Sequence, residues 1–269
     1  MSTGKNKIKL FQAQAQNAIA RTVTAAFASD PLIQWLRPGT QLGTNPNIQR
    51  WQHRRVQSIM TNGMVFQSST VSQMARENPR KEEARKSSQS SDSSFGKVAE
   101  VSLYEDQAKS TGVEDAGAAI FLFPPPREVV WSISRTLLKL KIWLLDIFDP
   151  LQDIDCKMER VDQMMSAHTN SLKSMQKDYR QGLWYLEVVA VHPCLQSRGI
   201  GRGVMEWVLE YNRNQPIYLE CTQERNVGFY ESFGFRVLEE VVLTDETSDD
   251  ENATVKYWAM IRTGEDSLR

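Results

Sequence analysis

The stretch LWYLEVVAVHPCLQSRGIGRG, from Leu183 to Gly203, determines how the rest of the chain can fold. Its first part, Trp184 to Val191, is apolar and rich in β-branched residues, which is typical of a buried strand and too short for a membrane span. Pro193 ends the strand, because proline cannot donate a hydrogen bond to a sheet ladder. A short loop then opens into a helical pattern, whose apolar stripe consists of Val204, Trp207, Val208 and Tyr211.

The loop between this strand and helix has the features of a diphosphate-binding site. Gly199 and Gly201 let backbone N–H groups approach a ligand without obstruction by a Cβ atom. The first-turn N–H groups of the helix lack internal partners, and the helix dipole favours negative charge there. Arg198 adds a planar guanidinium that suits phosphate oxygens. A glycine-rich turn without a ligand is common, so further motifs are needed to decide.

Two nucleotide-binding motifs fit this loop less well than a third. A P-loop needs Gly-Lys followed by Ser or Thr, whereas the chain has Gly201-Arg202-Gly203. A dinucleotide fingerprint would place its third glycine at Val204, although Glu220 ends the next strand at a suitable distance. The third motif, Gln/Arg-x-x-Gly-x-Gly/Ala after a strand, is matched at every specified position by Gln196, Ser197, Arg198, Gly199, Ile200 and Gly201.

This third motif resembles the acyl-CoA pyrophosphate loop of the GCN5-related N-acetyltransferases (GNAT family). The resemblance continues downstream, where the strand Ile217 to Cys221 is followed by Asn226, Tyr230 and Phe233-Gly234-Phe235. This order is similar to the second signature of the family, in which a helix ends at a glycine before another strand. The close resemblance covers residues 184–242, and elsewhere only the order of the elements matches.

The resemblance implies a fold and a reaction. The fold is α/β (mixed α+β), a central mixed and mostly antiparallel sheet of about seven strands flanked by helices, as one domain over residues 1–269. The reaction is transfer of an acetyl group from acetyl-CoA, without a metal, to a primary amine of a small molecule or a protein lysine, by direct attack in a ternary complex. The alternatives are a catalytically silent acyl-CoA-binding protein of the same fold and an interaction module. The sequence indicates neither the amine nor the oligomeric state.

The resemblance also suggests which residues hold the cofactor. Backbone groups near Val189 and Val191 would pair with the pantetheine arm, and the amide of Val189 would stabilise the oxyanion. Asn226 would hydrogen-bond the pantetheine, although a role as a helix cap is equally compatible with its position. Tyr230 would share a helix face with Asn226 and protonate the departing thiolate, unless it is simply packed in the core.

Glu187 is the candidate general base. Strand alternation places it on one face with Tyr185, Val189 and Val191, so that desolvation among apolar neighbours would raise its pKa toward the working pH. The alternative is that Glu187 pairs with an arginine or lysine, or faces solvent. His192 follows the strand and is predicted to be a loop residue.

Composition limits the class of protein. The chain of 269 residues is 41% hydrophobic and 24% charged, as in ordinary globular proteins. Its net charge of −1 argues against a nucleic-acid partner. The three cysteines, Cys156, Cys194 and Cys221, have no metal-site spacing and favour a reducing, cytoplasmic location. We expect no transmembrane segment and no signal peptide.

The remaining elements follow from local patterns. Ile8 to Phe11 predicts a short strand, Asn17 to Leu36 a helix broken at Asp30-Pro31, and Asn47 to Met60 a second helix. Residues 67–97 are rich in Ser, Lys, Gln and Glu, which predicts a disordered insert. Lys97 to Tyr104 is predicted to pair with Ala118 to Phe123 as a central hairpin.

Two amphipathic segments lie between this hairpin and the central strand. Residues 127–148 predict a helix with a broad apolar arc and basic residues in its middle. A lid-like helix over the acceptor groove is the favoured interpretation, and a helix lying on a membrane surface is the alternative. Met158 to Tyr179 predicts a further helix, and two strands, Arg236 to Leu243 and Val255 to Ile261, end the fold.

Overall fold

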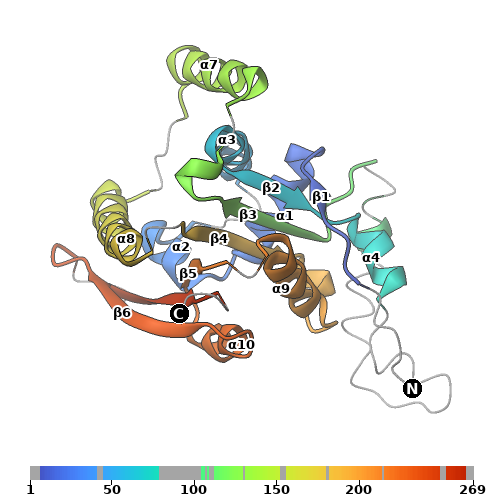
Figure 1. Cartoon of the computed structure of the whole chain (residues 1–269). Helices are drawn as coiled ribbons and strands as arrows, with labels where there is room; N and C mark the ends of the chain where they lie inside the picture. Colours follow the sequence, from blue (N-terminus) through green and yellow to red (C-terminus); the bar gives the residue numbers. More distant parts are fainter. Residues whose placement is uncertain are drawn as a thin grey trace, which may run out of the picture.

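The computed structural model describes residues 7–40, 45–78, 104–106, 108, 112–129, 131–151, 156–179, 182–213, 215–248 and 253–264. Within these ranges the strands form one seven-stranded sheet in the order β1-β2-β3-β4-β5-β7-β6 (Figure 1). All neighbouring pairs are antiparallel except β4 with β5. The strands are β1 (Phe11–Gln12), β2 (Met64–Gln67), β3 (Ala118–Phe123), β4 (Trp184–Val191), β5 (Ile217–Cys221), β6 (Arg236–Thr244) and β7 (Thr254–Arg262). This is the predicted mixed, mostly antiparallel fold.

Helices cover both faces of the sheet. The longer α-helices are α1 (Gln16–Ala26), α3 (Pro46–Asn62), α7 (Ile133–Phe148), α8 (Met158–Asp178) and α9 (Ile200–Tyr211). The shorter ones are α2 (Pro31–Leu36), α4 (Val71–Glu77) and α10 (Val227–Glu231), with 3₁₀ turns η1 (Pro126–Glu128), η2 (Pro193–Leu195) and η3 (Glu224–Asn226). Apolar side chains of α1 and α3 pack with β2, β3 and β4 in one cluster, and those of α4 and α9 pack on the opposite face in another.

The predicted break in the first helical segment is confirmed at Asp30-Pro31. α1 ends at Ala26, and the Asp30 carboxylate begins α2 by accepting hydrogen bonds from the backbone N–H groups of Leu32 and Ile33. Pro31 occupies the first turn, where its missing N–H costs nothing. The break places Asp30 near the end of β5, where its carboxylate accepts a hydrogen bond from the hydroxyl of Thr222.

The central stretch folds as its sequence predicts. β4, α9 and β5 have the predicted order, and β4 and β5 have the predicted bounds. β7 pairs antiparallel with both β5 and β6, so the seventh strand lies between the fifth and the sixth. That insertion makes β6 an edge strand and completes the sheet (Figure 1).

The prediction of a disordered insert over residues 67–97 is wrong in its first part. Gln67 belongs to β2, and α4 follows from Val71 to Glu77. Val71 and Met74 are buried in the core cluster under α9, and Thr70 caps the helix. A helix of two turns needs only these few apolar contacts, so a polar average composition conceals it. Residues 79–97 lie outside the described residues.

The predicted hairpin of Lys97 to Tyr104 with Ala118 to Phe123 is also wrong. β3 pairs with β2 on one side and with β4 on the other, so both of its hydrogen-bonding edges are occupied. Residues 97–103 lie outside the described residues, and Tyr104 begins a helical turn. The partner that the sequence conceals is the four-residue strand Met64–Gln67.

Candidate active site

The parallel strands β4 and β5 separate in the middle of the sheet. Their ladder joins Trp184, Tyr185 and Leu186 to Ile217, Tyr218 and Leu219, but β4 continues to Val191 and β5 to Cys221. Within the described residues, the β5-facing edge of β4 beyond Leu186 therefore has no strand partner. An extended ligand can hydrogen-bond to such an open edge as an added strand would.

Glu187 lies at a β-bulge, so the prediction that Tyr185, Glu187, Val189 and Val191 share one face of the strand is wrong. Leu186 pairs with Leu122 and Val188 with Phe121, so Glu187 is an additional residue in β4. A bulge reverses the alternation of side chains beyond it. Val189 and Val191 consequently pack on the α9 face, whereas Tyr185 and Glu187 face a cavity on the other side of the sheet. The four residues do not share one face.

The predicted diphosphate loop is assembled at the N-terminus of α9. Ser197 and Gly199 both have left-handed backbone conformations, with φ of 65° and 79°. A non-glycine residue in this region is uncommon and often marks a functional turn. Gln196, Ser197 and Gly199 are exposed, while Ile200 anchors the first turn in the core.

Gly201 and Gly203 have different roles within α9. A Cβ atom on Gly201 would meet Phe229 at 3.7 Å and Val191 at 4.0 Å, which is ordinary contact. A Cβ at Gly201 would therefore be tolerated next to the free edge of β4, and nothing in the packing requires a glycine there. A Cβ on Gly203 would lie 2.4 Å from Ile8 Cγ1, so Gly203 is needed for packing. Gly199 is the open position of the loop, since a Cβ there would meet nothing within 4 Å.

Two loop side chains make contacts that the sequence does not predict. Arg198 donates a hydrogen bond through Nη1 to the carbonyl oxygen of Asn78, 3.2 Å away at the end of α4. Gln196 donates through Nε2 to the Val191 carbonyl oxygen at 3.2 Å. Arg198 is thus held beside the loop by the segment that the sequence predicts to be disordered.

Asn226 and Tyr230 lie at the two ends of α10. Asn226 is exposed and precedes the helix, where its side chain makes no capping hydrogen bond. Tyr230 packs edge-on against Phe229 and Phe235, with ring centroids 5.2 and 5.9 Å apart. Burial raises the pKa of the Tyr230 hydroxyl well above its ordinary value, and the nearby Cys221 adds to this. Tyr230 is therefore protonated at neutral pH.

A cavity of about 990 Å³ lies on the opposite face of the sheet from α9. Its wall is mostly apolar and aromatic, with contributions from α1, α2, α3, β4, β5 and α8. α8 supplies Met158, Val161, Met164, Met165, His168, Leu172 and Gln176. Glu187 and Glu220 stand where β4 and β5 separate, so the cavity adjoins the open edge of β4.

α8, rather than α7, covers this cavity, and the lid-like role predicted for residues 127–148 is therefore wrong. Among the described residues of this range only Val129 lines the cavity, and no residue of α7 does. α7 instead packs on α3, where Arg54 forms ion pairs with Asp146 and Asp149, and where Arg135 donates to the Gly63 carbonyl oxygen. Both α7 and α8 are amphipathic, so the sequence pattern alone does not show which of them covers the cavity.

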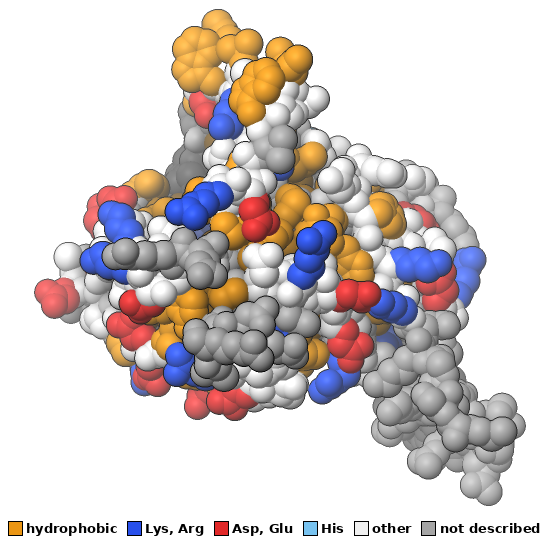
Figure 2. All heavy atoms as spheres, viewed as in Figure 1, with side chains coloured by type: hydrophobic (Ala, Val, Ile, Leu, Met, Phe, Trp, Pro, Cys, Tyr) orange, Lys and Arg blue, Asp and Glu red, His pale blue; other side chains and the backbone are white. Residues whose placement is uncertain are grey.

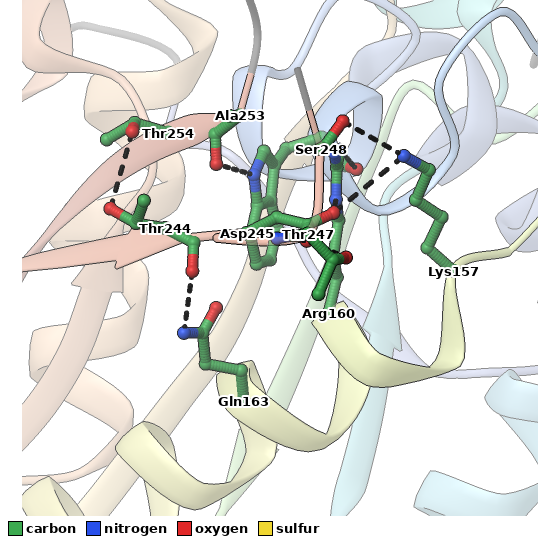
Figure 3. Close-up of polar contacts among 10 residues, drawn as sticks. Lys157, Arg160, Gln163, Thr244, Asp245, Thr247, Ser248, Ala253 and Thr254 are labelled. Carbon is green, nitrogen blue, oxygen red and sulfur yellow. Dashed lines mark hydrogen bonds and ion pairs between the residues drawn. The ribbon is translucent and has the colours of Figure 1, made fainter. Parts of the chain in front are cut away.

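A buried arginine holds α8 in place (Figure 3). Arg160 is 1% exposed and donates through Nε to Asp245 Oδ2 and through Nη1 to the Trp35 carbonyl oxygen, both at 2.7 Å. Lys157 Nζ lies 3.7 Å from the same carboxylate oxygen. Hydrogen bonds from Thr247 and Arg160 lower the pKa of Asp245 to about 2. These contacts fix the start of α8 to the loop between β6 and β7.

A group of hydrogen-bonded side chains in the cavity is centred on Glu220. Its carboxylate oxygens lie 2.9 and 3.1 Å from His168 Nδ1 and accept hydrogen bonds from the hydroxyls of Tyr218 at 3.0 Å and Tyr185 at 3.2 Å. Because a carboxylate only accepts, Nδ1 of His168 carries the proton and Nε2 has the lone pair. The hydrogen bond to Glu220 raises the pKa of His168, although burial opposes this shift. The arrangement is that of an oriented general base.

Two further carboxylates line the same cavity. Glu187 accepts a hydrogen bond from Arg55 at 2.5 Å, so the alternative of pairing with an arginine is what the structure shows. Asp30 is 1% exposed and accepts a hydrogen bond from the hydroxyl of Thr222. Burial raises the pKa of Asp30 despite these hydrogen bonds. Arg37 and Arg55 line the same cavity, so its mostly apolar wall has side chains of both charges.

The sequence alone does not predict a role for His168, and it indicates Glu220 only as the acidic residue of a dinucleotide fingerprint. The two residues lie 52 positions apart along the chain, so no local motif joins them. The available signal was a histidine on the apolar stripe of the predicted helix Met158 to Tyr179. His192 lies between β4 and η2 as the N-cap of η2, so its prediction as a loop residue is confirmed.

Two negative findings concern the described residues. They contain no group of three or more His, Cys, Asp or Glu side chains placed to hold a metal ion. Among the helices in the described ranges, none is both long enough and apolar enough to cross a bilayer.

Comparisons with known proteins agree with this architecture. The family model described as "Acetyltransferase (GNAT) domain" matches residues 168–237. A comparison with curated proteins gives no significant match. Arylalkylamine N-acetyltransferase 2 from Aedes aegypti is similar in structure, with a TM-score of 0.53 and 12% identity over 96% of this chain and 99% of that chain. An acetyltransferase from Corynebacterium glutamicum, described as histone acetyltransferase HPA2 and related acetyltransferase, has a TM-score of 0.48 and 15% identity over 96% and 97% of the two chains.

The match over residues 168–237 begins at His168 and includes β4, the loop at the start of α9, β5 and α10. It thus contains nearly every residue that the sequence predicts to bind the cofactor or to act on the substrate. At this level of identity the structural likeness shows the fold. The chain therefore has the fold of the GNAT acetyltransferases and carries their domain signature over residues 168–237.

Proposed function

We propose that this protein transfers an acetyl group from acetyl-CoA to a primary amine by direct attack in a ternary complex. The observation that carries the proposal is the separation of β4 and β5 beyond Leu186 and Leu219. It leaves an open strand edge with the loop at Gly201 near one side and the carboxylate-lined cavity on the other. Donor and acceptor would thus approach each other through the sheet.

The cofactor would occupy the side of α9. Its diphosphate would bind the amides of the loop from Gln196 to Gly201, and its pantetheine arm would pair with β4 near Val189 and Val191. The open position at Gly199 and the left-handed conformations of Ser197 and Gly199 support this placement. Asn226 lies at the start of α10, exposed and available to hydrogen-bond the arm.

The acceptor would be a small amine with an apolar body. The cavity is within the size range of sites for small ligands, and it is enclosed by α8. The apolar wall would bind the body of the amine, and the carboxylates of Glu187 and Glu220 would attract its ammonium group. A protein lysine is less suited, since a long chain would have to enter beneath α8.

The reaction needs one proton acceptor and one proton donor. The amine must lose a proton before its nitrogen attacks the acetyl carbonyl carbon, after which the C–N bond forms and the C–S bond breaks. Glu187, the base predicted from the sequence, and His168, oriented by Glu220, both line the cavity and are the proposed proton acceptors. Tyr230 is the proposed donor to the departing thiolate, because burial keeps its hydroxyl protonated.

A turnover assay tests this proposal. The protein is incubated with acetyl-CoA and a set of arylalkylamines, polyamines and amino acids, and both the free thiol and the acetylated amine are measured. We expect both products in equal amounts with at least one amine. Binding of acetyl-CoA without turnover for any amine would favour the catalytically silent protein instead.

A further inference from the structure

α7 has two apolar faces, and within the described part of the chain only one of them packs against another element. Leu138, Ile142 and Leu145 are half-buried on the side of the helix that faces α3. A second row follows helical spacing on the opposite side and consists of Ile133, Leu137, Leu140, Leu144 and Ile147. We call this row, together with Trp143 and Phe148, the outer stripe. Its members are 39% to 79% exposed.

The size of the outer stripe is unusual for a solvent-facing surface. Leucines and isoleucines scattered singly on a surface need no explanation, but a contiguous apolar row usually marks an interaction site. Trp131, just before the helix, is also 75% exposed and extends the apolar surface. Figure 2 shows these hydrophobic side chains gathered at the top of the molecule.

The charges around the outer stripe are basic. By helical spacing, Lys139 and Lys141 lie on either side of it, and neither forms an ion pair with a described carboxylate. The acidic residues near the end of the helix are already neutralised from α3, since Asp146 lies 3.1 Å from Arg54 and Asp149 lies 2.7 Å from Arg50. The exposed side of α7 therefore combines apolar residues with uncompensated positive charge.

The position of α7 suits a flat partner. In Figure 1 the helix stands at one end of the molecule, beyond α3. None of its residues lines the cavity. The outer stripe is thus a ridge, and a ridge can rest on a planar surface without collision with the rest of the protein. An exposed helix with Trp and Phe on an apolar face flanked by lysines is the pattern of helices that lie in a membrane interface.

We propose that the outer stripe of α7 docks this protein on an anionic lipid surface, with the helix axis in the plane of the membrane. Lys139 and Lys141 would contact acidic headgroups, while Leu140, Trp143 and Ile147 would enter the boundary with the acyl chains. A second copy of the chain is a poorer partner, because two such stripes would bring lysines against lysines, while the nearby carboxylates of Asp146 and Asp149 already pair with Arg54 and Arg50. The inference does not depend on acetyl transfer.

Vesicle flotation tests the proposal on the full-length protein. Vesicles of phosphatidylcholine alone are compared with vesicles that also contain phosphatidylserine, at low and at high salt. We expect binding to the anionic vesicles only, weakened by salt because the attraction to headgroups is screened. Lys139→Glu/Lys141→Glu should lower the apparent affinity by about tenfold or more, since each lysine near an anionic surface contributes about 1 kcal/mol.

Two pairs of variants separate docking from general effects. Lys173→Glu/Lys177→Glu makes the same change of charge on exposed positions of α8 and should retain binding. Leu140→Ser/Trp143→Ser should abolish binding, whereas Val242→Ser, at a 49% exposed position of β6, should not. Circular dichroism checks that each variant is folded.

Three results would overturn the proposal. One is equal recovery of the protein with neutral and anionic vesicles, and another is binding that survives Leu140→Ser/Trp143→Ser. The third is a dimer in analytical ultracentrifugation that this double substitution dissociates while vesicle binding is absent, because the stripe would then be a protein interface. None of these measurements uses acetyl-CoA, so their outcome is independent of the turnover assay.

Discussion

His168 Nδ1 lies 2.9 Å from Glu220 Oε1, and this contact joins the helix that covers the cavity to the strand that forms its floor. α8 is held at its start by Arg160 and Asp245, so the imidazole is presented from a fixed element (Figure 3). The tautomer that Glu220 imposes leaves Nε2 able to accept a proton from an amine. The relationship makes a specific kinetic prediction.

His168→Gln should lower kcat by about a hundredfold or more if His168 removes the proton from the amine. The hydrogen bond to Glu220 raises the pKa of His168, so kcat/KM should rise with pH around a pKa above the ordinary histidine value. Glu220→Gln removes the group that raises this pKa and should move the rise to lower pH. The measurement is the pH profile of kcat/KM for the three proteins.

Glu187→Gln is the matched comparison, because Glu187 lines the same cavity. If His168 is the base, this variant should raise KM for the amine and keep the rise of kcat/KM with pH, moved slightly to lower pH because the charge of Glu187 also raises the pKa of His168. A profile that disappears in Glu187→Gln and persists in His168→Gln would assign the base to Glu187, as the sequence predicts.

Gly201→Val should weaken acetyl-CoA binding at least tenfold while the protein stays folded. A Cβ at this position would meet Phe229 and Val191 at ordinary contact distance, so the fold should tolerate the substitution. The added methyl groups would lie where the diphosphate of the cofactor is proposed to bind. Isothermal titration calorimetry measures the affinity, and thermal unfolding reports on the fold. Glu206→Ala, on the exposed face of the same helix, should bind like the wild type. Unchanged affinity in folded Gly201→Val would remove the diphosphate site from this loop.

Tyr230→Phe should lower kcat by about a hundredfold while Tm and the affinity for acetyl-CoA remain those of the wild type. The substitution keeps the ring that packs against Phe229 and Phe235 and removes only the proton donor. Steady-state kinetics and calorimetry on the same preparation provide the test. Retained kcat would show that Tyr230 is a packing residue and that water or another group protonates the thiolate.

Asp245→Asn should lower the Tm at neutral pH by several degrees, because it leaves the buried guanidinium of Arg160 without its ionic partner. In the folded protein the pKa of Asp245 is lowered to about 2 from its ordinary value of 3.8. Its contribution to stability is therefore complete above pH 3.8 and is lost as the pH falls toward 2. The difference in Tm between wild type and variant should shrink over that interval.

Asp162→Asn is the control for this experiment, since Asp162 is exposed on the same helix. It should leave Tm unchanged at every pH. A constant difference between Asp245→Asn and the wild type down to pH 2 would contradict the role given to the carboxylate.

Local patterns in the sequence were sufficient where structure is local. The run from Trp184 to Gly203 specifies a strand, a turn and a helix through β-branching, proline and glycine, and the structure confirms each of them. Asp30 and Pro31 likewise specify the start of α2, as its N-cap and its first residue. These elements depend on residues that lie close together in the chain.

Features that depend on distant residues could not be predicted in this way. The bulge at Glu187 exists because β4 pairs with β3, and it decides which side chains reach the cavity. The four residues of β2 are too few for a periodic pattern, so the partner of β3 was missed. His168 gains its role only through Glu220, and whether α7 or α8 covers the cavity depends on Arg160 reaching Asp245.

The most direct test of the central claim is mass-spectrometric detection of an acetylated small amine formed from acetyl-CoA by the wild-type protein. The account predicts that an amine with an apolar body is acetylated with an equal amount of free thiol released, and that His168→Gln and Tyr230→Phe slow this reaction without loss of acetyl-CoA binding. Tight binding of acetyl-CoA without acetylation of any amine in the set, under conditions where the protein is folded, would contradict it.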